Sequence, residues 1–143
     1  MAILDLIVGG FIGTVVMTMM ILYGYMMSLM PKDWNMIIDG MGKKMNDMMG
    51  VPASMAWGVH FLIGTIIHPL VYDSVWVGAL GLNLGPYINE IIYAIIFAII
   101  MIMMLGFLEA PREWRGKMAI GIIMAHIVYA IVLALFASLA LFS

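Results

Sequence analysis

The sequence contains no cysteine and very little charge. Only 10% of its 143 residues are Asp, Glu, Lys or Arg, whereas 66% are hydrophobic. The lack of cysteine excludes a scaffold held together by disulfide bonds, and six Lys and Arg against eight Asp and Glu leave no basic surface for a nucleic acid. Soluble domains have roughly a quarter of their residues charged. The composition therefore excludes a soluble globular protein and predicts an integral membrane protein surrounded by a lipid bilayer.

Catalytic motifs are absent as well. Without cysteine and with few serines, the sequence offers no obvious nucleophile–base–acid triad. It also lacks the His-Glu-x-x-His spacing of a catalytic zinc site. We therefore expect the chain not to be an enzyme on its own, which leaves membership of a membrane enzyme complex open.

Four long apolar stretches follow one another along the chain. Each has about the 20 residues that a helix needs to cross a hydrocarbon core of ~30 Å. Pro52 and Pro86 stand at plausible first helical turns, and Pro69 is expected to kink or end the second helix. The sequence predicts a single all-α domain, a transmembrane four-helix bundle with spans at residues 3–29, 52–72, 86–108 and 117–142.

The positive charges predict the orientation of this bundle. All of them lie in two connecting segments: Lys32, Lys43 and Lys44 in the first, and Arg112, Arg115 and Lys117 in the third. Lys and Arg mark cytoplasmic loops of membrane proteins. We therefore expect residues 30–51 and 109–117 in the cytoplasm and both termini outside, in a cytoplasmic (inner) membrane.

The first cytoplasmic segment, residues 33–49, has an amphipathic pattern. Its apolar residues recur every three or four positions: Trp34, Ile37, Ile38, Met41, Met45 and Met48. This spacing predicts a short helix that lies on the membrane surface. Gly40 and Gly42 interrupt the pattern, so an irregular loop is the alternative, and the apolar face could equally dock a partner.

Small residues one helical turn apart mark two of the spans. Gly9, Gly10 and Gly13 lie in the first span, and Gly121 and Ala125 lie in the fourth. This spacing lets helix backbones approach closely in lipid. We interpret these residues as helix-packing positions, either within one chain or between chains.

The 18 methionines offer soft thioether ligands, for example in the runs Met17–Met20 and Met101–Met104. Copper binds such ligands. Methionine also fills irregular apolar gaps, and here it is scattered through every span. The second interpretation is the one that the sequence favours.

Two histidines form the candidate intramembrane polar site. His60 and His126 fall at nearly one depth, ~12–13 Å from the cytoplasmic ends of their spans at ~1.5 Å per residue, and Thr18 lies within about a turn of that level. Such a pair can share a proton, ligate a transition metal or hold a haem iron. The alternative is that each neutral imidazole donates one N–H across a helix contact.

His68, Asp73 and Glu90 form a second constellation near the outer ends of their spans, with Asp5 at a similar level. Carboxylates of this kind can hold a hard cation, which makes these residues metal candidates. In the alternative interpretation, Asp5 and Glu90 occupy first helical turns, where a negative charge is favourable, and Asp73 is solvated.

Three stretches of the sequence look familiar together: GGFIGTVVMTMM in the first span, WGVHFLIGTIIHPLVY in the second and MAHIVYAIVLAL in the fourth. This pattern resembles the YagU-like small four-span inner-membrane proteins and covers about half of the chain. The resemblance implies the same four-span fold. It also implies prominence for His60, Gly64, His126 and Tyr129, with Gly64 as a further packing position.

These features lead to three hypotheses for function. Short loops, little mass outside the membrane and small-residue helix faces favour a non-catalytic accessory subunit of a larger complex, for instance a respiratory or oxidoreductase assembly. We then expect bound lipid and other membrane subunits, in a hetero- or homo-oligomer. The first alternative is a small oligomeric transporter or channel for protons or metal ions that uses His60 and His126. The second is an electron carrier that holds haem or a metal.

Overall fold

The computed structural model describes residues 3–27, 37–82 and 84–141, and all regular structure in this part of the chain is helical. Four helical runs within it are long and apolar enough to cross a membrane: α1 (Ile3–Met26), the run Met55–Ala79, α5 (Pro86–Phe107) and α6 (Arg115–Leu139). A shorter helix, α2 (Ile37–Met49), precedes the second run. The predicted all-α four-helix fold is confirmed, and it indicates an integral membrane protein.

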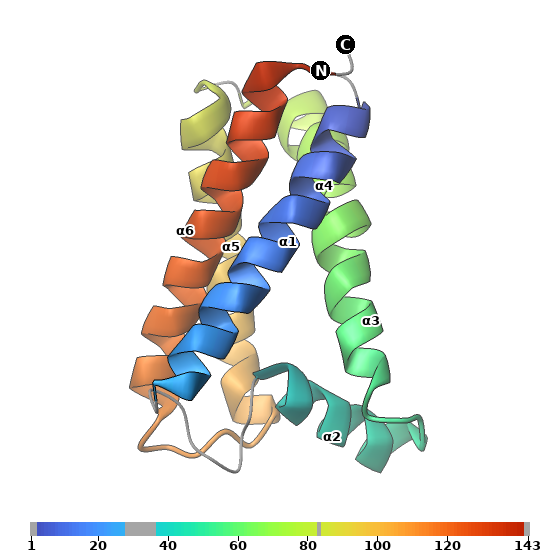
Figure 1. Cartoon of the computed structure of the whole chain (residues 1–143), viewed down its shortest axis with the longest axis vertical. Helices are drawn as coiled ribbons and strands as arrows, with labels where there is room; N and C mark the ends of the chain where they lie inside the picture. The colour runs from blue at the N-terminus through green and yellow to red at the C-terminus, as the bar shows by residue number, and fades with distance from the viewer. Residues whose placement is uncertain (1–2, 28–36, 83, 142–143) are drawn as a thin grey trace.

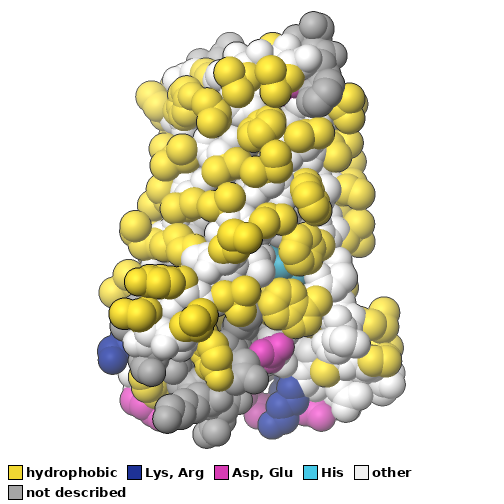
Figure 2. Space-filling view, viewed as in Figure 1, with side chains coloured by type: hydrophobic (Ala, Val, Ile, Leu, Met, Phe, Trp, Pro, Cys, Tyr) yellow, Lys and Arg dark blue, Asp and Glu magenta, His cyan; other side chains and the backbone are white. Residues whose placement is uncertain are grey.

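The helices form a bundle with α2 across one end (Figure 1). Helix α6 packs along both α1 and α5, and α1 also contacts the second run. The start of α1 and the end of α6 lie at the end of the bundle opposite α2. Charged side chains gather at the α2 end, whereas hydrophobic side chains cover the length of the bundle (Figure 2). The segments that carry the positive charges therefore share one end of the molecule.

The second run alternates between two kinds of helix. It consists of α3 (Met55–Leu62), the π-helical segment η1 (Ile63–Ile67), α4 (His68–Val71) and the π-helical segment η2 (Tyr72–Ala79). The sequence-based end at residue 72 is too early, because the run continues through Pro69 to Ala79. In an α-helix a proline removes one amide donor and clashes with the carbonyl four residues back. In the turn before Pro69, amides donate to carbonyls five residues back, as the His68 amide does to the Ile63 carbonyl. The proline therefore follows a π-helical turn, which is wider than an α-helical turn.

The other predicted boundaries differ from the structure by a few residues at most. Helix α2 begins at Ile37. The first four residues of the predicted amphipathic segment lie outside the described part, and so do residues 28 and 29 of the predicted first span. Gly85, which has a positive φ of 90°, precedes Pro86 at the start of α5. The fourth helix starts at Arg115, two residues before the predicted position, and ends at Leu139.

Three glycines of α1, Gly9, Gly10 and Gly13, lie where the neighbouring helices approach closely. A Cβ atom on Gly9 would stand 2.8 Å from the Cβ of Phe136 in α6, and one on Gly13 would stand 3.0 Å from the ring of Tyr129. On Gly10 it would stand 2.7 Å from Cγ of Pro69 and 2.8 Å from the carbonyl oxygen of Gly64. The glycine face of α1 therefore contacts both α6 and the second run.

Two more predicted packing positions face the same interior. A Cβ atom on Gly64 would collide with the side chain of Thr14 in α1. Ala125 of α6 is buried in the apolar core beside Tyr129, whereas Gly121, one turn earlier, is half-buried. Close backbone contact is thus a property of α1 and the second run in particular.

Helix α5 ends in a Schellman motif, in which two amides turn back to bond earlier carbonyls. The Ala110 amide donates to the Leu105 carbonyl at 2.9 Å, and the Glu109 amide donates to the Gly106 carbonyl at 3.1 Å. Glu109 takes the left-handed conformation, with φ of 61°, that glycine usually fills in this motif. Its carboxylate accepts a hydrogen bond of 2.7 Å from the Lys44 ammonium group, which ties α2 to the end of α5.

Candidate functional site

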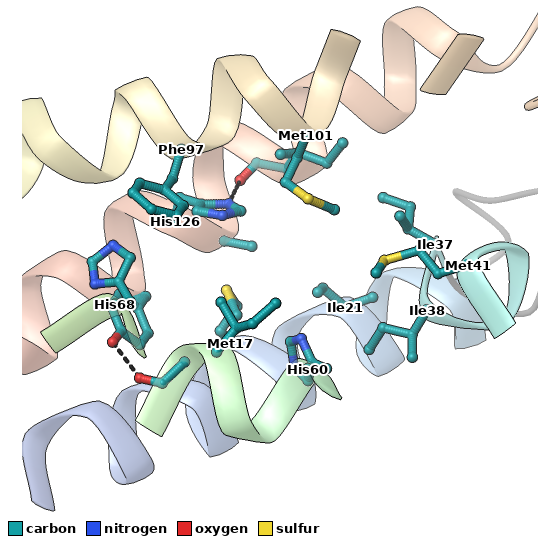
Figure 3. A pocket seen from close by; sticks show the side chains of 15 residues that line it. Met17, Ile21, Ile37, Ile38, Met41, His60, His68, Phe97, Met101 and His126 are labelled. Carbon is teal, nitrogen blue, oxygen red and sulfur yellow. Dashed lines mark hydrogen bonds between the residues drawn. The ribbon is translucent and has the colours of Figure 1, made fainter. Parts of the chain in front are cut away.

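A cavity of about 110 Å³ lies inside the bundle, where α1, α2, α3, α5 and α6 meet (Figure 3). Most of its lining is apolar, for example Met17 of α1 and Ile37 of α2. The titratable side chains of this lining are His60, His68, His126 and Tyr129. All histidines of the sequence therefore line one cavity, which we call the histidine cavity.

His60 is anchored to α1 through Thr18. Its Nε2 atom lies 2.9 Å from the Thr18 hydroxyl oxygen, and the same hydroxyl donates to the Thr14 carbonyl at 2.7 Å. A threonine hydroxyl has one proton to donate, so in this chain of bonds the imidazole Nε2–H is the donor to Thr18. In a neutral ring, Nδ1 then carries the lone pair.

His126 has the opposite tautomer. Its Nδ1 atom lies 2.8 Å from the Ile122 carbonyl oxygen, one turn earlier on α6 (Figure 3). A carbonyl oxygen only accepts, so this Nδ1 carries the proton and Nε2 has the free lone pair. No hydrogen bond joins His126 to His60 in the described part of the chain. The two rings share the cavity and each is anchored to a different helix.

His68 is the most deeply buried of the three histidines, with 4% of its surface exposed. Three aromatic rings surround it, with centroid distances of 4.6 Å to Tyr93, 4.8 Å to Phe97 and 4.7 Å to Tyr129. Within the described residues, neither ring nitrogen has a hydrogen-bond partner. A buried imidazole without a partner is costly, which makes His68 a functional candidate.

The π-helical segment explains why His68 faces this cavity. In an uninterrupted α-helix, residues eight positions apart are offset by about 80° around the axis. A π turn holds more residues, each with less rotation, so η1 reduces the offset between His60 and His68. Sequence reasoning assigned His68 to the outer constellation because nothing in the residue pattern marks a π turn.

Tyr129 holds α6 against the second run. Its ring is buried, and its hydroxyl donates a hydrogen bond to the Gly64 carbonyl oxygen. Gly13 of α1 has no Cβ atom, which leaves room for this ring. Tyr129 therefore packs three helices together and presents its ring to His68.

The predicted outer constellation is not assembled. In the parts of the chain that the structure describes, no three His, Asp or Glu side chains come together as a metal-binding group, so His68, Asp73 and Glu90 do not form such a group. Asp73 is partly buried in η2, and Asp5 is fully buried in the first turn of α1. These positions give no structural support to a hard-cation site.

The environment of Glu90 differs from the prediction. It lies beyond the first turn of α5, is fully buried, and neither carboxyl oxygen has a partner among the described residues. Asn89 stabilises the helix start instead, because its side chain accepts from the Leu84 amide at 3.2 Å and donates to the Leu82 carbonyl at 2.7 Å. The interpretation of Glu90 as a charge at the helix N-terminus is wrong. Its carboxyl group lies one turn from Tyr93 in the bundle interior.

Comparisons with known proteins add no relative. No protein-family model, no curated protein and no solved structure matches the chain. The resemblance to YagU-like proteins therefore stays a prediction, and we infer function from the geometry of the site.

Proposed function

We propose that the chain is a small membrane protein that conducts protons through the histidine cavity. The observation that carries this proposal is that His60, His68 and His126 all line one cavity inside an apolar bundle. Ionisable side chains inside a membrane protein are costly and commonly form proton relays. Histidine suits this role because a neutral imidazole has one nitrogen that carries a proton and one that can accept a proton.

The hydrogen bonds around the cavity support a relay rather than a fixed structural contact. His126 has a free Nε2 lone pair, and both nitrogens of His68 lack a partner within the described residues. Tyr93 and the fully buried Glu90 continue the polar groups beyond His68 along α5. Each of these groups can accept and release a proton.

The size of the cavity favours a proton over the larger species considered from the sequence. Pockets for organic ligands measure roughly 300–1,000 Å³, whereas this cavity has about 110 Å³, which gives no room for haem. A metal ion needs several converging ligands, and no such group of His, Asp and Glu forms in the described ranges. A proton needs neither volume nor a coordination shell.

We also propose the orientation that the charges predict. The described residues with positive charge belong to α2, to the loop before α6 and to the start of α6: Lys43, Lys44, Arg112, Arg115 and Lys117. With this end in the cytoplasm, the cavity lies on the cytoplasmic side of the bundle next to α2. His68 and Glu90 then lead from the cavity toward the outer end.

Proton flux into liposomes tests the proposal. The purified chain in vesicles that contain a pH-sensitive dye should dissipate a pH gradient, and His126→Phe should slow it by about 100-fold, the lower range for a positioned proton-transfer group. The control is Tyr23→Phe, which removes a polar atom from an exposed position on α1 and should leave flux unchanged. Equal flux in wild type and His126→Phe, or flux no faster than in empty vesicles, would exclude the proposal.

The accessory-subunit hypothesis has one structural observation in its favour. In each of the runs Met55–Ala79 and Pro86–Phe107, only 28% of an apolar stretch of 18 residues is buried inside the bundle. These open faces can contact lipid or other subunits. A purification from native membranes tests this hypothesis, because a complex predicts other chains that co-purify in fixed proportion, whereas a chain that elutes alone contradicts it.

A further inference from the structure

A second cavity, of about 200 Å³, lies between α2 and the end of α5. Five of the residues that line it are methionines: Met41, Met45, Met48, Met49 and Met104. The other described residues of the lining are Lys44, Phe107 and Leu108. We call this cavity the methionine groove.

The helical spacing places these thioethers around one space. Met41, Met45 and Met48 follow each other at four- and three-residue intervals, so they share a face of α2. Met104 faces them from α5, one turn before Phe107. Met48 and Met49 are exposed at the surface. The groove is therefore open to an ion at the charged end of the bundle.

The groove offers soft ligands and no hard ones. Among the described residues, its lining contains no carboxylate, carboxamide or imidazole, and the sequence has no cysteine that could compete for a soft metal. Lys44 is the one cationic residue in the described part of its lining, and the ammonium group is paired with Glu109 at 2.7 Å and lies 5.3 Å from the centre of the Phe107 ring. The positive charge that would repel a metal ion is thus compensated by a carboxylate outside the groove.

The methionine groove also adjoins the histidine cavity. Met41 lines both spaces, and Met17 and Met101 continue the thioethers inside the histidine cavity (Figure 3). Soft ligands therefore extend from the exposed end of α2 toward His60 and His126. Thioethers, like thiolates, select Cu(I) in proteins, and imidazoles also bind copper.

We propose that the methionine groove is a binding site for Cu(I), held by thioether sulfur atoms of α2 and α5. The site goes beyond the proposed proton pathway and does not depend on it, because no residue that carries the proton argument belongs to the groove. Binding needs no oxidant or reductant, since the ion enters and leaves as Cu(I).

Methionine also packs well as an apolar residue, and substitution by leucine separates this role from metal binding. Leucine keeps the apolar volume, at a cost that is usually below about 1.5 kcal/mol per site, but it removes the sulfur. The variant Met45→Leu/Met48→Leu/Met104→Leu leaves Met41 and the histidine cavity intact. The matched control is Met19→Leu/Met103→Leu/Met124→Leu, in which all substituted residues are exposed and line neither cavity.

The experiment is a calorimetric titration of the full chain in detergent with Ag(I), a redox-stable probe for Cu(I), in chloride-free buffer. Wild type and control should bind one equivalent with the same affinity. The groove variant should bind more weakly by more than the roughly 10–100-fold that loss of an outer-sphere partner costs at a metal site. A thermal unfolding curve of each variant verifies that the fold is kept.

Three results would overturn the proposal. The first is absence of saturable Ag(I) binding to the wild type, and the second is equal affinity in groove and control variants. The third is binding that His60→Gln/His126→Gln abolishes while the groove variant retains it, because the ion would then occupy the histidine cavity. A Met45→Leu single variant serves as the test if the triple variant does not fold.

Discussion

Substitution of Gly10 by alanine should separate α1 from the second run. The added Cβ would stand 2.7 Å from Cγ of Pro69, 2.8 Å from the Gly64 carbonyl oxygen and 3.1 Å from the Thr65 carbonyl oxygen. Two of these neighbours are backbone atoms and the third belongs to a rigid ring. Because no flexible side chain can move aside, the helices themselves must separate.

The magnitude follows from two opposing contributions. Extra methylene groups in a well-packed interior cost about 1–3 kcal/mol, and the rigid neighbours of Gly10 place this substitution at the upper end. Alanine favours the helix over glycine by about 1 kcal/mol. The net loss in the free energy of unfolding should be about 2 kcal/mol, which is roughly a 30-fold change in the unfolding equilibrium at about 1.4 kcal/mol per factor of ten.

Gly24→Ala on the same helix is the matched control. No atom lies within 4 Å of the Cβ that it would add, so only the gain in helix propensity applies and stability should stay equal or rise by up to about 1 kcal/mol. Reversible unfolding by SDS in mixed micelles, followed by circular dichroism, measures both variants against the wild type. Equal stability of Gly10→Ala and Gly24→Ala would refute the close packing of α1 against η1 and α4.

The remaining predictions concern two of the hydrogen bonds that join distant elements. The hydrogen bond from the Lys44 ammonium group holds the pKa of the Glu109 carboxyl below its usual range. The bond therefore stabilises the fold above the ordinary pKa of a glutamate, and this stabilisation is lost as the pH falls through the lowered pKa of the folded state. The difference in melting temperature between wild type and Glu109→Gln should be present at neutral pH and vanish in acid, and a difference that does not change with pH would contradict it. Tyr129→Phe removes the hydroxyl that donates to the Gly64 carbonyl and should cost about 1 kcal/mol in the free energy of unfolding. Tyr23→Phe, at an exposed position, should cost nothing measurable, and equal losses in the two variants would show that the bond to Gly64 does not stabilise the fold.

Composition and local spacing were sufficient to predict the elements of this fold. The four spans follow from apolar length, and α2 follows from a three-to-four-residue pattern that needs no tertiary information. The contact of Thr18 with His60 also lies within reach of sequence reasoning, because equal depth in the membrane is a matter of counting residues. Each of these properties depends on one helix and its position relative to the bilayer.

The features that the sequence does not predict depend on helix rotation. His68 belongs to the histidine cavity only because η1 turns it toward His60, and a π turn has no clear residue signature. Glu90 resembles a charged residue near a helix start, yet its burial depends on which face of α5 meets α6 and η2. The five methionines of the groove come from two helices. The spacing along the sequence can group the four methionines of α2, but it cannot show that Met104 of α5 faces them.

The π turn between His60 and His68 also changes how an equivalent site would be recognised in another chain. Because each amide in it bonds five residues back instead of four, the turn takes up one extra residue without rotating the helix that follows. The separation of eight positions between His60 and His68 therefore corresponds to a separation of seven in an uninterrupted α-helix, which is close to two turns. A relative with one residue fewer in this segment would present its two histidines to the same cavity, although an alignment without a gap would pair the second histidine with the wrong residue.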